Sequence, residues 1–187
     1  ASTSTGEVFM LTTEYDGIGM KFRLYGYNNV AELNYDVTLT TGTSGSKSSR
    51  ALGLTIAPDG NLMALKRVLV SDLPSGLTTS GTNQAYVLSK INSADGSVIW
   101  NKIINPYTDT QWNSSTSYVN GFDVGYLAEM AVDSTGASYV AWGVNGTSRY
   151  VKYDTNGTLV TTYDRVADTS TETFGKYNSK PAVIFAI

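Results

Sequence analysis

The residues that could do chemistry in this chain are its carboxylates, because the sequence contains neither histidine nor cysteine. These absences remove the commonest general base, the commonest metal ligand and the thiol nucleophile. Hydrolysis by paired carboxylates would need two acids that face one cleft. Glu14 with Asp16, and Asp123 with Glu129, lie close together in the sequence. Nothing in the pattern places either pair in a cleft, so we interpret them as solvated and predict no catalytic residue.

Four aspartates precede a glycine within short polar stretches, where they could either bind calcium or form turns. They are Asp59, Asp95, Asp133 and Asp154. A calcium loop needs alternating oxygen ligands, and no stretch of the chain has D-x-D-x-D spacing. An aspartate in a turn accepts a hydrogen bond from the backbone two residues further on. We therefore predict four turns, no metal site and no cofactor.

Other functional motifs are absent from the sequence. It contains no G-x-S-x-G element, no phosphate-binding loop and no dinucleotide fingerprint. The net charge is -3, and no basic run is longer than Lys66-Arg67, so we expect no nucleic-acid partner. No apolar run approaches the ~18 residues of a membrane span, so we expect no membrane partner.

One long polar segment, residues 104–126, carries the candidate binding residues. Four aromatic side chains interrupt it: Tyr107, Trp112, Tyr118 and Phe122. Aromatic side chains bring a large contact area at a low entropy cost, so they could stack on sugars or anchor a protein partner. They could equally pack against the edge of the fold, and both interpretations stay open.

Three N-glycosylation sequons are present, at Asn113, Asn145 and Asn156. In a chain this rich in serine, threonine and asparagine we expect such matches by chance, and two of the three coincide with predicted turns. The sequence does not decide whether they are used.

The elements that must position these residues are short strands, which recur along the chain. Each repeat predicts four strands, and in the second they are residues 52–58, 61–70, 84–91 and 97–103. These runs are rich in β-branched and aromatic residues, and Gly, Asn and Asp separate them. The "PDGN" and "ADGS" stretches are strong hairpin signals, because glycine tolerates a positive φ. Four short antiparallel strands per repeat are typical of a propeller blade.

The stretch "AYVLSKINSADGSVIWNKI" resembles the blade repeats of bacterial and phage β-propeller proteins, of the seven-bladed-propeller-related or quinoprotein-like kind. "IAPDGNLMAL" and "AVDSTGASYVAWG" are similar to the other half of such a blade. The resemblance implies an all-β fold of about three four-stranded antiparallel blades, within a larger or oligomeric propeller. The quinoprotein-like family also has a cofactor site with a calcium cage and a catalytic aspartate, which match no residues here.

We predict a single β-repeat region over residues 1–187, with blades at about 1–50, 51–126 and 127–187. Residues 181–187, "PAVIFAI", read as a strand that would complete the first blade. Three blades are fewer than the usual four to eight. The chain could therefore be a segment of a longer propeller, or several copies could form one ring or filament. A compact threefold structure such as a β-prism is the third alternative.

The functional expectation is a non-catalytic structural or binding module of an extracellular or virion assembly. Low charge and abundant serine and threonine resemble the β-rich parts of phage tail fibres, decoration proteins and bacterial surface proteins. The expected partners are other copies of the chain, neighbouring assembly proteins and a cell-surface glycan. The alternatives are an oligomeric propeller lectin and a fragment of a quinoprotein-like enzyme.

Overall fold

The computed structural model describes residues 1–42, 49–78, 84–104, 118–119, 122–123, 128–144 and 147–166. Over these residues the chain is all-β, with a single turn of 3₁₀ helix, η1 (Val70–Asp72), and no α-helix. No helix in the described part of the chain is long and apolar enough to cross a membrane. The chain divides into two compact units, Ala1–Asn105 and Pro106–Ile187, and each is considered by itself.

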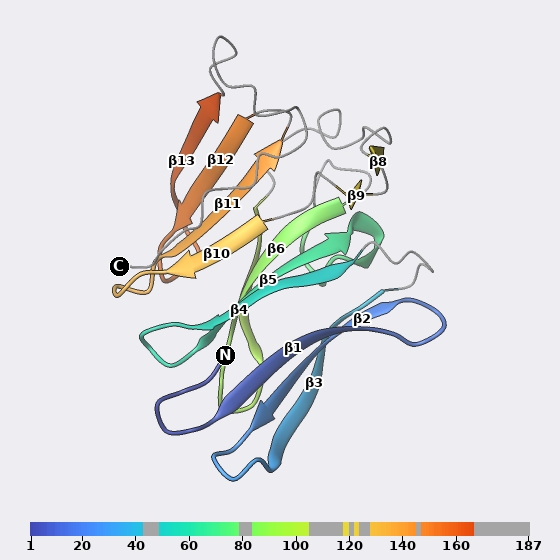
Figure 1. The fold of residues 1–187 in the computed structure, drawn as a ribbon, viewed down its shortest axis with the longest axis vertical. Helices are drawn as coiled ribbons and strands as arrows, with labels where there is room; N and C mark the ends of the chain where they lie inside the picture. The colour runs from blue at the N-terminus through green and yellow to red at the C-terminus, as the bar shows by residue number, and fades with distance from the viewer. Residues whose placement is uncertain are drawn as a thin grey trace. The chain divides into compact units, whose positions relative to one another are not determined.

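The first unit contains two antiparallel sheets whose strands follow chain order (Figure 1). The first sheet consists of β1 (Val8–Tyr15), β2 (Met20–Tyr27) and β3 (Leu33–Thr41). The second sheet consists of β4 (Arg50–Ile56), β5 (Leu62–Leu69), β6 (Gln84–Ile91) and β7 (Val98–Ile103). Short connections join most neighbouring strands, and a longer one, residues 70–83, joins β5 to β6. Sequential antiparallel strands of this kind are the arrangement of a meander and of a propeller blade.

The second unit contains the third sheet, again a four-stranded antiparallel meander (Figure 1). Its strands are β10 (Ala128–Val132), β11 (Ser138–Val144), β12 (Thr147–Tyr153) and β13 (Leu159–Val166). Two short strands, β8 (Tyr118–Val119) and β9 (Phe122–Asp123), pair with each other in a two-stranded sheet.

The prediction of an all-β fold with blade-like antiparallel repeats is confirmed by these three sheets. The four strands predicted for the second repeat coincide with β4 to β7 to within two residues at each end. The first sheet has three strands among the described residues, and the strand predicted at 181–187 lies outside them. The blade boundaries and the completion of a larger ring remain predictions.

The predicted turns are present, and aspartates hold them as the sequence indicates. Asp133 Oδ1 accepts the backbone N–H groups of Thr135 at 2.9 Å and Ala137 at 3.0 Å. The same bond to the N–H two residues on is accepted by Asp59, Asp95 and Asp154. Each of these side chains therefore satisfies backbone donors that a tight turn would otherwise leave unpaired.

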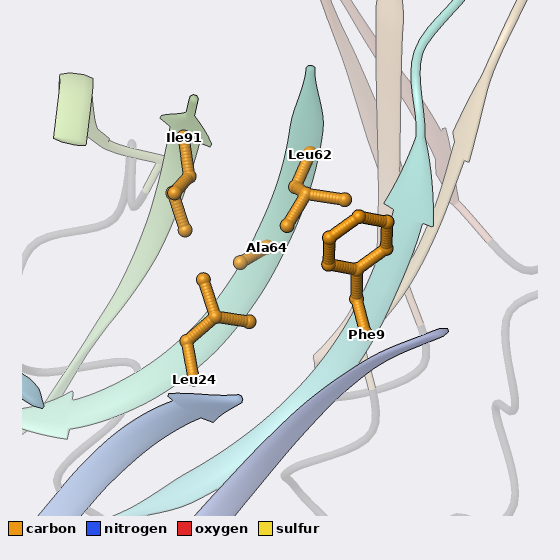
Figure 2. Close-up of a cluster of buried hydrophobic side chains, with 5 residues drawn as sticks. All are labelled: Phe9, Leu24, Leu62, Ala64 and Ile91. Atoms are coloured by element: carbon orange, nitrogen blue, oxygen red, sulfur yellow. The ribbon is translucent and has the colours of Figure 1, made fainter. Parts of the chain in front are cut away.

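A hydrophobic core joins the first and second sheets. Figure 2 shows its central side chains, which point toward one another from strands of both sheets. They are Phe9, Leu24, Leu62, Ala64 and Ile91, and all are at most 5% exposed. Because side chains alternate between the faces of a strand, burying Phe9 and Leu24 commits one whole face of the first sheet to this interface.

The core continues along the two sheets beyond this cluster. Phe22 of β2 packs with Val68 of β5 and with Ala85 and Val87 of β6. Here the sheets are also joined by a hydrogen bond, since the backbone N–H of Ala51 donates to Thr13 Oγ1 at 2.7 Å.

Tyr35 of β3 packs against two glycines, one from each sheet. A Cβ atom added at Gly26 of β2 would lie 2.4 Å from Tyr35 Cζ. A Cβ atom added at Gly96, in the turn between β6 and β7, would lie 2.4 Å from Val37 Cγ2 and 2.9 Å from Tyr35 Cε2. Burial raises the pKa of Tyr35 to about 12. Gly96 is therefore needed for the close approach of the two sheets, and Gly26 leaves room for the Tyr35 ring within the first sheet.

We expect Gly96→Ala to destabilise the first unit more than Gly60→Ala does. The two glycines have similar positive φ values, 75° and 81°, so an alanine at either position meets the same backbone strain of about 1–2 kcal/mol. A Cβ at Gly60 meets nothing within 4 Å, whereas one at Gly96 collides with Val37 and Tyr35. Overpacking should add about 1–3 kcal/mol at Gly96.

The measurement is urea-induced unfolding of both variants and the wild type. Equal losses in the free energy of unfolding would contradict the close packing of Gly96 against the first sheet.

Candidate functional site

The four predicted binding residues remain untested as a site. Tyr107 and Trp112 lie outside the described residues. Tyr118 begins β8 and Phe122 begins β9, and the backbones of these strands pair in the register Tyr118–Asp123 and Val119–Phe122. Binding through these four aromatic side chains therefore stays a prediction.

The carboxylates nominated as a pair, Glu14 and Asp16, serve different purposes. Asp16 Oδ1 accepts the backbone N–H groups of Ile18 at 2.9 Å and Gly19 at 3.0 Å, which closes the turn between β1 and β2. Its other oxygen lies 2.7 Å from Lys21 Nζ. The bond to Lys21 and these backbone bonds lower the pKa of Asp16. Asp16 is thus a turn residue. In the other nominated pair, Asp123 with Glu129, only the backbone of Asp123 is described.

The face of the first sheet that turns away from the second sheet carries a mixed polar and apolar surface, which we call the outer face. Alternation places on it the residues that lie between the core positions of β1 and β2. It comprises Val8, Met10, Thr12 and Glu14 of β1, Lys21, Arg23, Tyr25 and Tyr27 of β2, and Asp36 of β3, with Leu33 paired to Tyr27. Val8, Met10 and Leu33 are 45%, 44% and 53% exposed.

A network of charged and phenolic groups crosses the outer face from β1 to β3. Tyr25 Oη donates to Glu14 Oε1 at 2.6 Å, and Thr12 Oγ1 donates to the same oxygen at 2.9 Å. Arg23 Nε donates to Asp36 Oδ1 at 3.0 Å, and a second guanidinium nitrogen contacts the other oxygen of Asp36. The guanidinium also lies 3.8 Å from Glu14 Oε2 and 5.5 Å from the centroid of the Tyr25 ring. Arg23 is therefore held between two carboxylates.

These contacts set the charge states on the outer face. The hydrogen bond from Tyr25, followed by that from Thr12, lowers the pKa of Glu14. The same bond raises the pKa of Tyr25, and the bond to Asp36 raises the pKa of Arg23. A general acid needs a carboxyl whose pKa is raised toward neutrality. Glu14 is shifted in the opposite direction, so the network is suited to hydrogen bonding and not to proton transfer.

One end of the outer face is largely apolar. Tyr27 pairs across the strands with Val8 on one side and Leu33 on the other, and Tyr25 pairs with Met10. Methionine and tyrosine supply adaptable contact area, and the neighbouring network supplies fixed donors and acceptors. The combination is typical of a surface that binds another molecule.

A pocket of about 430 Å³ opens at the far end of the interface between the first and second sheets. It is lined by Thr13, Tyr15, Met20, Ser49, Arg50 and Ala51. The Tyr15 hydroxyl donates to the Gly17 carbonyl at 3.0 Å. The described part of the chain brings no three carboxylates together in a group that could hold a metal ion.

Lys66 of β5 is buried between the two sheets, with 0% of its surface exposed. It pairs with Ala51 of β4 and Val87 of β6, and its ammonium nitrogen lies 5.9 Å from the centroid of the Phe22 ring. The nitrogen has no hydrogen-bond partner among the described residues. Burial lowers the pKa of Lys66 from 10.5 to about 8. A lysine is almost never fully buried without a partner, which makes this position exceptional.

Sequence reasoning missed the outer face and Lys66 as candidate sites. The outer-face residues could have been found from the alternation in "MKFRLYGY", where charged and aromatic residues occupy every second position. Lys66 stands inside the apolar run "NLMALKRVLV", and a charge in such a run is itself the signal.

Comparisons with known proteins give no family. No protein-family model matches the chain, and no curated protein matches it. Among solved structures, the crystal structure of rhamnogalacturonan lyase YesW superposes with a TM-score of 0.49 at 10% identity. The match covers 88% of this chain and 36% of that chain, so this chain spans about a third of that structure's length. A likeness of this size carries no argument about function.

We expect Lys66→Met to raise the free energy of unfolding at pH 7. The folded pKa of about 8 lies below the unfolded value of 10.5, so the charged lysine destabilises the fold at all pH values below about 8. The difference corresponds to about 3 kcal/mol, and it should fade as the pH rises from about 8 to 10.5.

Urea unfolding of the wild type and Lys66→Met at pH 7, 9 and 10.5 measures this convergence. A constant difference in the free energy of unfolding between the two proteins across that range would show that burial does not lower the pKa of Lys66.

We expect Tyr25→Phe to raise the pKa of Glu14 toward 4.5, because the largest stabilising contact to the carboxylate is removed. A lowered folded pKa stabilises the fold above pH 4.5, and this stabilisation is lost as the pH falls through the folded pKa. The free energy of unfolding of the variant should therefore rise less between pH 3 and 5 than that of the wild type. NMR titration of the Glu14 carboxyl measures the shift. Tyr27→Phe is the matched control and should leave the titration of Glu14 unchanged.

Proposed function

We propose that this chain is a non-catalytic structural or binding module of an extracellular or virion assembly, which presents its surface to a glycan or protein partner. Its partners would be other copies of itself, neighbouring assembly proteins or a cell-surface glycan. The observation that carries the proposal is the outer face of the first sheet.

The composition of the outer face supports binding. Val8, Met10 and Leu33 are each more than 40% exposed, and they surround two tyrosines. Exposed apolar groups that are bordered by polar groups are typical of interaction surfaces. The polar border is already ordered, because Arg23 is fixed by Glu14 and Asp36. Binding to a pre-ordered surface loses less side-chain entropy, which favours affinity.

The chemistry of the chain supports a role without catalysis. No histidine or cysteine is available in the sequence to act as a base or nucleophile. The pKa values of Glu14, Asp16 and Asp133 are all lowered, so these acids are ionised and hydrogen-bonded at neutral pH. Ionised carboxylates that already accept hydrogen bonds can stabilise turns and strands, but they are poor general acids.

The experiment is a glycan array combined with sedimentation velocity on the purified chain. We expect a saccharide class to bind, or the chain to self-associate. The outer-face variant Met10→Ser/Tyr27→Ser should weaken this interaction about tenfold or more, as loss of an interface hot spot does. Ile99→Ser, which replaces an exposed apolar residue of β7 in the second sheet, is the matched control. Trp112→Ala tests the predicted aromatic loop in the same assay.

Three outcomes would contradict the proposal or move its binding surface. If the outer-face variant and the wild type interact equally, the outer face is not the binding surface; if Trp112→Ala alone loses binding, the loop is. Turnover of a bound glycan into new products would show that the chain is an enzyme.

A further inference from the structure

Lys66 does not itself line the pocket at the end of the two sheets, but a cross-strand neighbour connects it to the lining. Its cross-strand neighbour Ala51 lines the pocket, and so does Thr13, the cross-strand neighbour of Phe22. Side chains at directly paired positions have Cβ atoms roughly 4.5–5.5 Å apart. This distance is shorter than an extended lysine side chain, so the Lys66 ammonium can reach the pocket floor by turning away from the Phe22 ring.

The Lys66 ammonium has no hydrogen-bond partner among the described residues, and Arg50 adds a second cation at the pocket. One buried acid, Asp72, lies near the pocket, since its Oδ2 and the backbone oxygen of the lining residue Met20 would each be 2.8 Å from a Cβ added at Gly42. The two acids that flank the lining residue Tyr15 are already engaged: Glu14 with Tyr25 and Arg23, and Asp16 with Lys21. Asp72, the buried acid after β5, accepts a hydrogen bond from Ser71. A buried ammonium without a partner is unfavourable, and an anion placed beside it would remove that penalty.

We propose that this pocket binds a small molecule that carries an oxyanion, a carboxylate or a sulfate group, which forms an ion pair with Lys66. Arg50 lies at the pocket and attracts the same group. Ser49 and Thr13 offer hydroxyl groups, and the Thr13 hydroxyl can still donate because its oxygen accepts from Ala51. Tyr15 and Met20 supply the less polar wall. The combination selects an acidic ligand that also carries hydroxyl groups.

The size of the pocket limits the ligand. About 430 Å³ falls at the small end of the usual 300–1,000 Å³ range of ligand sites, which suits a molecule the size of a single sugar. An acidic monosaccharide, a uronate or a sulfated sugar, has the charge, the hydroxyl groups and the size. This site lies between the two sheets and the outer face lies on the opposite side of the first sheet, so each can be tested without the other.

The experiment measures thermal stability and calorimetric binding with glucuronate, glucose 6-sulfate and neutral glucose, at pH 7 and constant ionic strength. We expect either or both anionic sugars to raise the melting temperature, and glucose to have no effect. A carboxylate-only or sulfate-only response identifies which oxyanion the site takes. Lys66→Met should weaken binding by roughly 10- to 100-fold, the loss expected for one hydrogen bond to a charged group.

Two further variants make the result specific. Lys102→Met removes the same charge from β7, which contributes no residue to the pocket lining, and should leave anion binding unchanged. Ala51→Leu fills the pocket floor while Lys66 remains, and it should abolish binding. The proposal is overturned if neither anionic sugar raises the melting temperature above that in sodium chloride, or if Lys66→Met binds them as tightly as the wild type does.

Discussion

The packing of the first sheet on the second is the interaction on which the rest of the described first unit depends. Phe9 and Leu24 are buried against Leu62 and Ala64, and a fully buried side chain of this kind contributes about 1.5–3 kcal/mol. This contact fixes which face of β1 and β2 points inward. It therefore also decides that Glu14 and its neighbours face solvent, and that Lys66 is enclosed.

The two candidate sites follow from that single constraint in opposite ways. On the outer face, charges are solvated and paired, so Arg23 with its two carboxylates is compatible with a stable sheet. Between the sheets, Lys66 is enclosed by apolar neighbours and its ammonium has no hydrogen-bond partner among the described residues. The first site displays satisfied polar groups beside exposed apolar ones, and the second holds an unsatisfied charge beside a pocket.

The sequence was sufficient for the elements and the turns, because these depend on local interactions. β4 to β7 follow from alternating apolar residues, and the turns follow from Asp59 and Asp133 beside glycine. Alternation and a charge in an apolar run mark individual residues of the two sites, but the surroundings of those residues could not be predicted, because they depend on which sheet covers which. Nothing near Lys66 in the sequence indicates that Ala51 and Phe22 will enclose it. Residues 104–126 were predicted to bind a partner because aromatic residues within a polar stretch are unusual. Each outer-face residue, taken alone, is ordinary for a strand.

The seating of Tyr35 against Gly26 and Gly96 ties three distant positions to one another. A larger residue at Gly26 would require a smaller residue at position 35, whereas Gly96 would still be held by its φ of 75° and by Val37. In diverging relatives positions 26 and 35 should therefore change together, while position 96 stays glycine. This pattern would be a better marker of common descent than the turn motifs, which unrelated sheets acquire independently.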